Sequence, residues 1–287
     1  MALTPDSPPD GTPPEVQRKT FAAGEIVLEY AVCWPAGGSE RSAIALHGFS
    51  RPLEDMLAVR PLLPKGTALV MVHLPAHGRS SGHHRPLDPA AWFEAVLALM
   101  EHEKLTFDGT LIGYSLGGRL ALKWWSTEPE RFHRVLLMAP DGLVRNIGYR
   151  FSVETALGRA WLVSSTRGRS RQRMVAITEW LGRCGIIPEH FRQFSLFHLE
   201  TAEMWNMVVD CWLSLRPFWP AGPRQLKKVA RKHPGVLEAH FGERDKVIKP
   251  RNARKLKDVC PLHFHPCGHG LLRPDIIVRM TSPYSKS

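Results

Sequence analysis

Three histidines and a cysteine lie close together near the end of the chain. The stretch reads 261-PLHFHPCGHGLL-272 and contains His263, His265, Cys267 and His269. Histidine and cysteine are common ligands of transition metals, and histidine is also the most frequent general base in enzymes. No second group of cysteines or carboxylates at a recognised ligand spacing accompanies the stretch. The sequence therefore favours one functional histidine among chance neighbours, and it predicts no metal site.

A serine between two glycines is the candidate nucleophile for such a base. The motif 113-GYSLG-117 matches G-x-S-x-G and lies between a strand-like and a helix-like segment. A serine on a sharp strand-to-helix turn has a strained backbone, so the positions two residues away must lack bulky side chains. Gly113 and Gly117 meet that need. The motif predicts that Ser115 projects above the edge of a sheet, at the positive end of the helix that follows.

A serine nucleophile needs a histidine base and a carboxylate that orients the base. Asp245 ends an apolar segment within Gly-Glu-Arg-Asp, and His269 lies between two glycines after the next apolar segment. The chain order serine, aspartate, histidine is one in which known triads occur. These positions predict Asp245 as the acid and His269 as the base. Asp141, which follows the strand-like segment after Ser115, remains an alternative acid.

The turn 47-HGFS-50 follows an early strand-like segment. Two backbone N–H groups can stabilise the oxyanion that forms when a serine attacks a carbonyl group. We expect the amides of Phe49 and Leu116 to form this oxyanion hole, and we expect His47 to have a structural role. The histidines of 73-HLPAHGRSSGHH-84 are expected to lie in a polar surface loop rather than to bind metal.

Short, continuously apolar segments recur through residues 21–142 and again near the end of the chain. Continuous apolar runs indicate parallel strands that are covered on both faces. The segment 88–104 predicts a helix, with Asp88 as the N-cap and Pro89 at the first helical position. Alternation of strands and helices predicts an α/β fold with a mostly parallel central sheet flanked by helices. The expected strands are 25–34, 42–48, 68–75, 109–115, 134–140, 235–245 and 258–266.

The strand pattern stops between residues 143 and 232. This segment has 15 Lys and Arg against 6 Asp and Glu, a net charge of +9 out of +11 for the chain. We expect a helical cap insertion at 143–232, a core formed by 21–142 and 233–287, and a disordered proline-rich lead-in at 1–20. A basic surplus fits an anionic substrate, an anionic membrane surface or a solvated face.

Several classes of protein are disfavoured by the sequence. It has no uncharged apolar run long enough to span a membrane. Its first residues lack the basic and then apolar pattern of a secretory signal. The 5 cysteines contain no C-x-x-C pair, so reduced thiols are expected. Together these features predict a cytoplasmic protein.

The motifs described above resemble those of the α/β-hydrolase fold superfamily, and more narrowly those of a group of uncharacterised bacterial serine hydrolases with a cap. The resemblance runs from about residue 25 to the end and is carried by HGFS, GYSLGG, GERD and GHG. It implies a Ser115–His269–Asp245 triad that acts on esters or related acyl compounds. The D-x-P-G-H-G-x-S segment of relatives reads 73-HLPAHGRS-80 here, so substrate preference does not carry over.

The expected function is that of a serine hydrolase that cleaves a carboxylic ester through an acyl-enzyme, without metal or organic cofactor. A thioesterase, C–C hydrolase or menaquinone-pathway lyase acting on an anionic substrate remains an alternative, because GYSLGGR also resembles the elbow of that lyase family. A non-catalytic ligand- or membrane-binding member of the fold is the alternative from a different class. The expected partner is a small acyl substrate, not nucleic acid, with contact of the basic cap to an anionic membrane left open.

Overall fold

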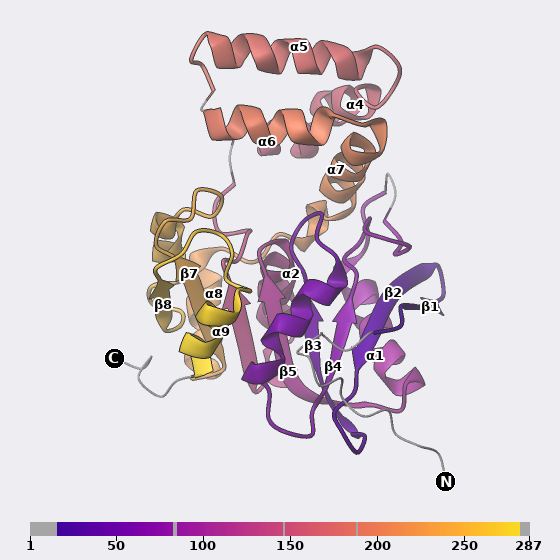
Figure 1. Cartoon of the computed structure of the whole chain (residues 1–287), viewed down its shortest axis with the longest axis vertical. Coiled ribbons are helices and arrows are strands. Elements are labelled where there is room, and N and C mark those ends of the chain that lie inside the picture. Colours follow the sequence, from indigo (N-terminus) through magenta and orange to yellow (C-terminus); the bar gives the residue numbers. More distant parts are fainter. Residues whose placement is uncertain (1–15, 83–84, 146, 188, 282–287) are drawn as a thin grey trace.

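The computed structural model describes residues 16–281, apart from residues 83–84, 146 and 188. Its centre is a sheet of eight strands in the order β1-β2-β4-β3-β5-β6-β7-β8 (Figure 1). Strand β2 is antiparallel to β1 and β4, whereas the pairs from β4 to β8 are parallel. The predicted mostly parallel α/β sheet is therefore confirmed. The strands are β1 (Lys19–Ala23), β2 (Ile26–Cys33), β3 (Arg41–Leu46), β4 (Ala68–Val72), β5 (Thr106–Tyr114), β6 (Arg134–Met138), β7 (Leu237–Gly242) and β8 (Leu262–His265).

Strand β1 was not expected from the sequence. It overlaps the predicted disordered lead-in at Lys19 and Thr20, and that part of the prediction is wrong; residues 1–15 lie outside the described residues. The strand forms because its backbone pairs along its whole length with β2, in a register that places Lys19 opposite Tyr30. A short edge strand of this kind depends on its partner more than on its own composition.

Helices cover both faces of the sheet. Helix α1 begins as predicted, with the Asp88 side chain accepting a hydrogen bond from the Ala90 N–H at 3.1 Å. Figure 1 shows α1, α2 and α8 behind the sheet, and α9 in front of it, where α9 contacts η1. The helices of these layers are α1 (Pro89–His102), α2 (Leu116–Thr127), α8 (Pro223–Lys232) and α9 (Pro274–Thr281), with 3-10 helices η1 (Leu53–Leu62), η2 (Pro129–Arg131), η3 (Arg216–Phe218) and η4 (Pro250–Leu256).

The main apolar cluster fills the space between the sheet and these helices. Its largest members include aromatic rings that pack in pairs, and the rings of Phe93 and Trp124 are stacked with centroids 4.6 Å apart. Both side chains are fully buried. Aromatic pairs of this kind add stabilisation beyond the area that they bury. The strands that lead to the motifs singled out in the sequence are thus part of a densely packed layer.

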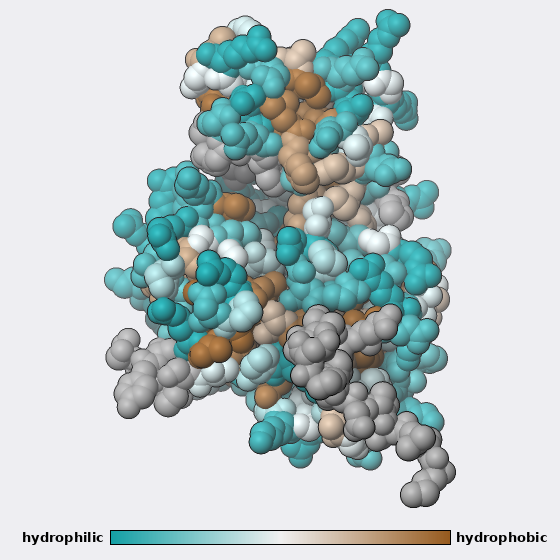
Figure 2. Space-filling view, in the orientation of Figure 1, coloured by the Kyte–Doolittle hydropathy of each residue, from teal (hydrophilic) through white to brown (hydrophobic). Residues whose placement is uncertain are grey.

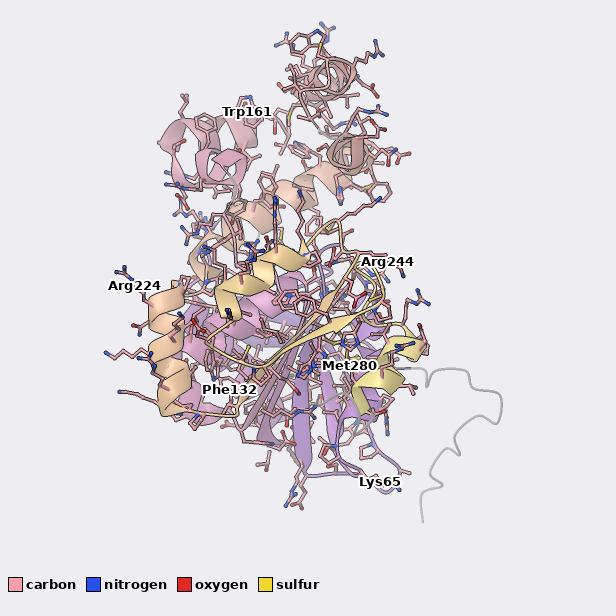
Figure 3. The ribbon with its side chains drawn as sticks, turned by 90° about the vertical axis from the view of Figure 1, so that its left-hand side faces the viewer. Lys65, Phe132, Trp161, Arg224, Arg244 and Met280 are labelled. Atoms are coloured by element: carbon pink, nitrogen blue, oxygen red, sulfur yellow. The ribbon has the colours of Figure 1, made fainter. Side chains whose placement is uncertain are left out.

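A group of helices, here called the upper helices, lies beyond the carboxyl ends of the parallel strands. Trp161 of this group and Lys65, which precedes β4, lie toward opposite ends of the molecule (Figure 3). The upper helices enclose a second, smaller apolar cluster. No helix of the described residues is long and apolar enough to cross a membrane. The upper helices are α3 (Ile147–Glu154), α4 (Ala156–Ser164), α5 (Ser170–Arg183), α6 (Glu189–Leu199) and α7 (Ala202–Ser214).

Helix α8 packs with the sheet rather than with the upper helices. The sequence pattern places it inside the expected insertion, which runs to residue 232. Its buried residues Leu226 and Val229 belong to the main apolar cluster, and the helix contacts α2 and η4. An amphipathic helix shows from its sequence which face is apolar, but it does not show which layer covers that face.

Candidate active site

Ser115 occupies a strained turn between β5 and α2. Its backbone has φ 52° and ψ −112°, a region that a residue with a side chain rarely adopts. The Ser115 N–H donates to the Met138 carbonyl at 2.8 Å, which ties the turn to β6. Strain of this kind costs on the order of 1–3 kcal/mol and persists only where the surrounding structure holds it. The turn projects the serine at the carboxyl edge of the sheet.

The two motif glycines allow this turn to pack closely. A Cβ atom on Gly117 would lie 2.1 Å from the Leu46 carbonyl oxygen, and one on Gly113 would lie 2.6 Å from the Gly117 oxygen. Both clashes involve backbone atoms, which cannot move aside. The glycines are therefore required by the approach of α2 to β3 and β5.

His269 bridges Ser115 and Asp245 in the structure. The Ser115 hydroxyl lies 3.0 Å from His269 Nε2, and His269 Nδ1 lies 2.7 Å from Asp245 Oδ2. The Asp245 side chain is fully buried, and its Oδ1 accepts hydrogen bonds from the N–H groups of Val247 and Ile248 at 2.8 and 2.9 Å. One carboxylate oxygen is thus fixed by the backbone while the other orients the imidazole.

Neighbouring strands bring these residues together. Asp245 follows β7 and His269 follows β8, and parallel strands end at the same edge of a sheet. The Tyr114 hydroxyl donates to the His269 carbonyl at 2.9 Å and so ties the histidine loop to the end of β5. Burial raises the pKa of Tyr114 to about 12, so this hydroxyl keeps its proton across the neutral range.

Asp141, the alternative acid, has a different partner. Its carboxylate pairs with Arg119, whose Nε lies 3.0 Å from Asp141 Oδ2. Burial alone would lower the pKa of Arg119, but the Asp141 carboxylate raises it. The guanidinium also lies 4.7 Å from the Trp219 ring centroid and contacts the Tyr149 hydroxyl. Asp141 therefore neutralises a buried cation where the upper helices join the sheet.

The amide of Leu116 directly follows Ser115, and Phe49 belongs to a loop that packs against the serine turn. Leu116 is the first residue of α2, and the loop before Phe49 packs against the turn, because a Cβ on Gly48 would lie 3.3 Å from Ser115 Cβ. The next amides are engaged: Gly117 N–H donates to the His47 carbonyl and Ser50 N–H to His77 Nε2. Among the described residues, no hydrogen bond uses the N–H of Phe49 or Leu116.

Three buried histidines hold the turn that contains Phe49. His47 Nδ1 lies 2.7 Å from the Gly48 oxygen, and its Nε2 lies 2.9 Å from His73 Nδ1 and accepts from the Leu74 N–H. Burial lowers the pKa of His77 to about 4, so its ring is neutral and Nε2 can accept from Ser50. The structural role expected for His47 agrees with these contacts.

The prediction of a polar surface loop is wrong for His73 and His77, which are only 4% and 3% exposed. Hydrogen bonds to neighbouring rings and carbonyls satisfy polar groups that the amino-acid types alone would place in solvent. His83 and His84, in the same predicted loop, lie outside the described residues.

A second group of side chains has the chemistry of a metal site. Glu238 and His240 of β7 and His263 of β8 place one ligand atom each within 4.8 Å of the others. Of these residues only His263 is singled out by the sequence motif; Glu238 and His240 were not predicted. The signal was present as Glu-Ala-His in β7, since residues two apart on a strand point to the same face.

Comparisons with known proteins agree with the fold. The model of a family described as "Alpha/beta hydrolase family" matches residues 43–279. The dihydrolipoyllysine-residue acetyltransferase component of the acetoin cleaving system of Pseudomonas putida is 24% identical over 229 residues, which cover 79% of this chain and 58% of that protein. A "Probable serine hydrolase" of Drosophila melanogaster is 26% identical over 105 residues, covering 36% of this chain and 32% of that protein. The chain thus spans 58% and 32% of the length of these two curated relatives.

Solved structures share the architecture at low sequence identity. The structure of MGS-M2, an alpha/beta hydrolase enzyme from a Medee basin deep-sea metagenome library, has a TM-score of 0.63 and 15% identity, and the match covers 91% of this chain and 95% of that one. At this level of identity the likeness concerns the fold alone. It includes the central sheet and the positions of the flanking helices.

Proposed function

This chain belongs to the alpha/beta hydrolase family, and we propose that it is a serine hydrolase that cleaves carboxylic esters through Ser115, His269 and Asp245. The observation that carries the proposal is the continuous set of hydrogen bonds from Asp245 through His269 to Ser115. A nucleophile, a base within hydrogen-bonding distance and a group that orients the base are the parts that acyl transfer by serine requires.

In the acylation step, His269 Nε2 accepts the Ser115 proton as Oγ attacks the ester carbonyl carbon. In this proposal the N–H groups of Phe49 and of Leu116, the first residue of α2, stabilise the charge that develops on the carbonyl oxygen. The tetrahedral intermediate collapses when the imidazolium gives its proton to the alkoxide leaving group. The products are an alcohol and an ester of Ser115.

In the deacylation step, His269 takes a proton from water, and the hydroxide attacks the Ser115 ester. The intermediate collapses to a carboxylic acid, and Ser115 recovers its proton from the imidazolium. Throughout the cycle, Asp245 Oδ1 accepts from two backbone N–H groups while Oδ2 orients the His269 ring and stabilises the imidazolium. This cycle uses no metal and no organic cofactor.

A second candidate function is hydrolysis of an anionic acyl substrate such as a coenzyme A thioester. A groove of about 570 Å³ lies between α4, α7 and the segment around Pro86, and it is lined by Arg159, Arg167 and Arg216. The described residues that line it include no carboxylate. Three cations around one groove favour a ligand with phosphate or carboxylate groups.

The groove also adjoins the apolar cluster of the upper helices. Val163 and Leu213 line the groove and pack in or against that cluster, and Phe49 of the proposed oxyanion hole packs against the same cluster. A substrate with an anionic head and an acyl chain would fit these two surfaces, with the head at the arginines of the groove and the chain along the apolar cluster toward Phe49. The same triad chemistry applies to an ester, a thioester or a C–C bond next to a carbonyl group.

A substrate panel tests both candidates. Wild type and Ser115→Ala are assayed with p-nitrophenyl esters, acyl coenzyme A thioesters and vinylogous diketones, and the proposal predicts that Ser115→Ala loses about 10⁴-fold or more in kcat/KM on every substrate turned over. Turnover that survives the substitution would contradict the serine mechanism.

The role of the groove is tested by comparing variants of its arginines with a control variant elsewhere on the surface. Arg159→Gln combined with Arg167→Gln should raise KM for a coenzyme A thioester by about 10-fold and leave KM for p-nitrophenyl acetate unchanged, since a contact to a phosphate is charge-assisted. Arg224→Gln, on α8 well below the upper helices (Figure 3), is the control for loss of a surface cation. Equal KM values for both variants would remove the anionic-substrate candidate.

A further inference from the structure

We propose that Glu238, His240 and His263 form a zinc-binding site on strands β7 and β8, separate from Ser115, His269 and Asp245. The three ligand atoms lie within 4.8 Å of one another. Two imidazole nitrogens and one carboxylate oxygen are a ligand set that zinc accepts in proteins. The proposal does not depend on the hydrolase function, because these residues lie within β7 and β8, whereas Asp245 and His269 lie in the loops that follow the two strands.

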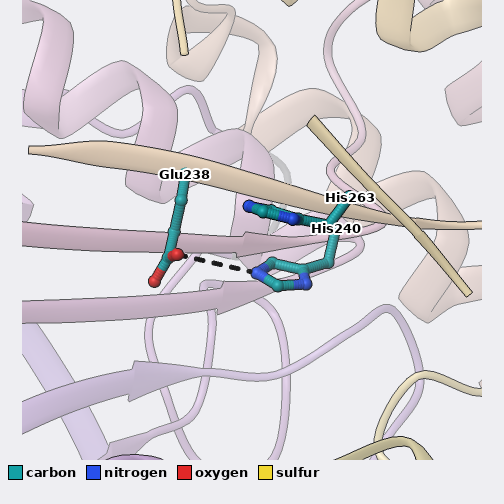
Figure 4. A group of neighbouring side chains, drawn as sticks. All are labelled: Glu238, His240 and His263. Carbon is teal, nitrogen blue, oxygen red and sulfur yellow. Dashed lines mark ion pairs between the residues drawn. The ribbon is translucent and has the colours of Figure 1, made fainter. Parts of the chain in front are cut away.

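The positions of the three residues on the paired strands β7 and β8 bring their side chains together. Glu238 and His240 are two residues apart on β7 and therefore point to one face of the sheet. His240 is paired with His263 across β7 and β8, and their ring centroids are 4.7 Å apart. Figure 4 shows the carboxylate of Glu238 beside the two rings, with its dashed line to His240. Ligands carried on paired strands are held more firmly than ligands on loops.

His240 carries the observation that points to a ligand. The residue is 4% exposed, and its Nε2 atom is buried without a hydrogen-bond partner among the described residues. The nearest carboxylate oxygen, Glu238 Oε2, lies 3.8 Å away, which is too far for a hydrogen bond. A buried nitrogen left in this way costs about 1–3 kcal/mol. A cation between Nε2 and the carboxylate would satisfy both groups.

Outer contacts already orient two of the ligands. His240 Nδ1 lies 2.9 Å from His265 Nε2, so its Nδ1–H can donate to His265 while Nε2 keeps its lone pair toward Glu238. Arg134 donates to Glu238 Oε1 at 3.1 Å and leaves Oε2 for the cation. Metal-binding histidines and carboxylates usually have such outer partners, which fix the tautomer and the ring orientation.

Zinc binding requires the ligand atoms to move closer together and the His263 ring to turn out of its stacked arrangement with His240. With metal–ligand bonds of about 2.0–2.1 Å in a tetrahedral site, ligand atoms are about 3.4 Å apart. Glu238 and His263 are partly exposed, so their side chains can rotate toward His240, which is buried. The same exposure gives the ion a path from solvent and leaves the fourth position to water. Arg134 offsets part of the Glu238 charge, so we expect an affinity lower than that of a closed four-ligand site.

A zinc ion at this site would also link β7 and β8, the strands that precede Asp245 and His269. Asp245 follows β7 by three residues and His269 follows β8 by four residues. A metal bound only by the folded chain stabilises it by RT ln(1 + c/Kd), where c is the free zinc concentration. At a zinc concentration of about 100 times Kd, the midpoint of thermal unfolding should rise by about 5 °C for a chain of this size.

The test measures zinc binding to the full chain and to matched variants. All proteins carry Cys184→Ser, because Cys184 is an exposed thiol that could bind zinc by itself. Each chelator-treated protein is titrated with zinc against a chromophoric chelator, and with cobalt to record the absorption bands of a bound ion. The variants are His263→Gln, Glu238→Gln and His240→Gln, and His102→Gln on the exposed end of α1 is the control.

The proposal predicts one equivalent of zinc for the parent protein and for His102→Gln. His263→Gln and His240→Gln should weaken binding by about 100-fold or more, since even the loss of outer partners costs about 10–100-fold. His263 is partly exposed, so its variant provides the test even where His240→Gln fails to fold. Zinc binding by His263→Gln and Glu238→Gln with the affinity of the parent, or no saturable binding by the parent, would overturn the proposal.

Discussion

The sheet and the upper helices are packed in different ways. The sheet and its flanking helices completely bury several of the largest side chains of the chain, including Trp92, Trp124 and Trp125. Helix α5 of the upper helices has no buried residue among those described. Figure 2 shows apolar surface among the charged residues at that end of the molecule. The large apolar side chains that are exposed there are Phe151, Leu157, Trp161, Ile177, Trp180, Ile186 and Phe197.

In the proposed function, the catalytic residues lie at the edge of the sheet and the substrate-binding groove lies among the upper helices. The proposed catalytic groups lie on short turns at the ends of buried strands. Two backbone N–H groups hold Asp245 in place, and the Tyr114 hydroxyl holds the loop of His269. Catalysis requires groups placed to within a fraction of an ångström, which a dense layer provides. The upper helices carry the arginine-lined groove, to which the proposed function assigns substrate binding. We therefore expect substitutions to act on rate in the sheet and on substrate preference in the upper helices.

The largest expected effect compares the two acids. Asp245→Asn should lower kcat by about 10⁴-fold with little loss of stability, because the imidazole would lose the partner that fixes its tautomer. Asp141→Asn should keep kcat within about 10-fold but lower the free energy of unfolding by about 1–2 kcal/mol, since the buried Arg119 would lose the charge of a carboxylate that is itself 29% exposed.

Steady-state ester hydrolysis and urea unfolding of both variants measure these effects. A larger loss of kcat in Asp141→Asn than in Asp245→Asn would assign the acid to the turn after β6.

The packing contrast predicts a difference between two tryptophans. Trp124→Ala should lower the free energy of unfolding by about 4 kcal/mol, because it removes a fully buried ring that stacks on Phe93. Trp180→Ala, at a side chain that is 59% exposed, should change it by less than about 0.5 kcal/mol. Urea unfolding of the two variants makes the comparison, and a similar loss in both would mean that α5 is packed as firmly as the sheet.

Acid should destabilise the sheet through His77. The pKa of His77 is lowered by burial to about 4 in the folded chain, from an ordinary value of 6.5. The unfolded chain therefore binds the extra proton first, so this stabilisation is complete above pH 6.5 and is lost as the pH falls toward 4. The loss is about 3 kcal/mol at most. His77→Gln should flatten the fall in stability between pH 6.5 and 4, measured by urea unfolding, and an unchanged slope would mean that other groups cause it.

Much of the sheet is predictable because buried parallel strands are continuously apolar. Five strands lie within the segments expected from that pattern, β3 and β5 overlap theirs but begin earlier, and Asp88 caps α1 as its position indicates. The proximity of Ser115, His269 and Asp245 follows from the same pattern, since each residue comes directly after a parallel strand or its turn. The elbow glycines add a steric reason that is visible in the sequence.

Other features depend on pairing and packing across the chain. His263 gains His240 as a neighbour only through the register of β7 with β8, and Glu238 joins them through the alternation of side chains on β7. His73 and His77 are buried by contacts with His47 and with backbone groups of nearby loops. The partner of Asp141 is an arginine on α2 that no spacing rule connects to it. Such pairings are set by tertiary structure rather than by local composition.

The identity of the nucleophile is tested most directly by a covalent probe. The full chain is treated with a fluorophosphonate, and the labelled residue is located by peptide mass spectrometry in wild type, Ser115→Ala and Asp245→Asn. We predict one adduct per chain, on Ser115, with no labelling of Ser115→Ala and much slower labelling of Asp245→Asn. An adduct on another residue, or equal labelling of Ser115→Ala, would contradict the proposed triad.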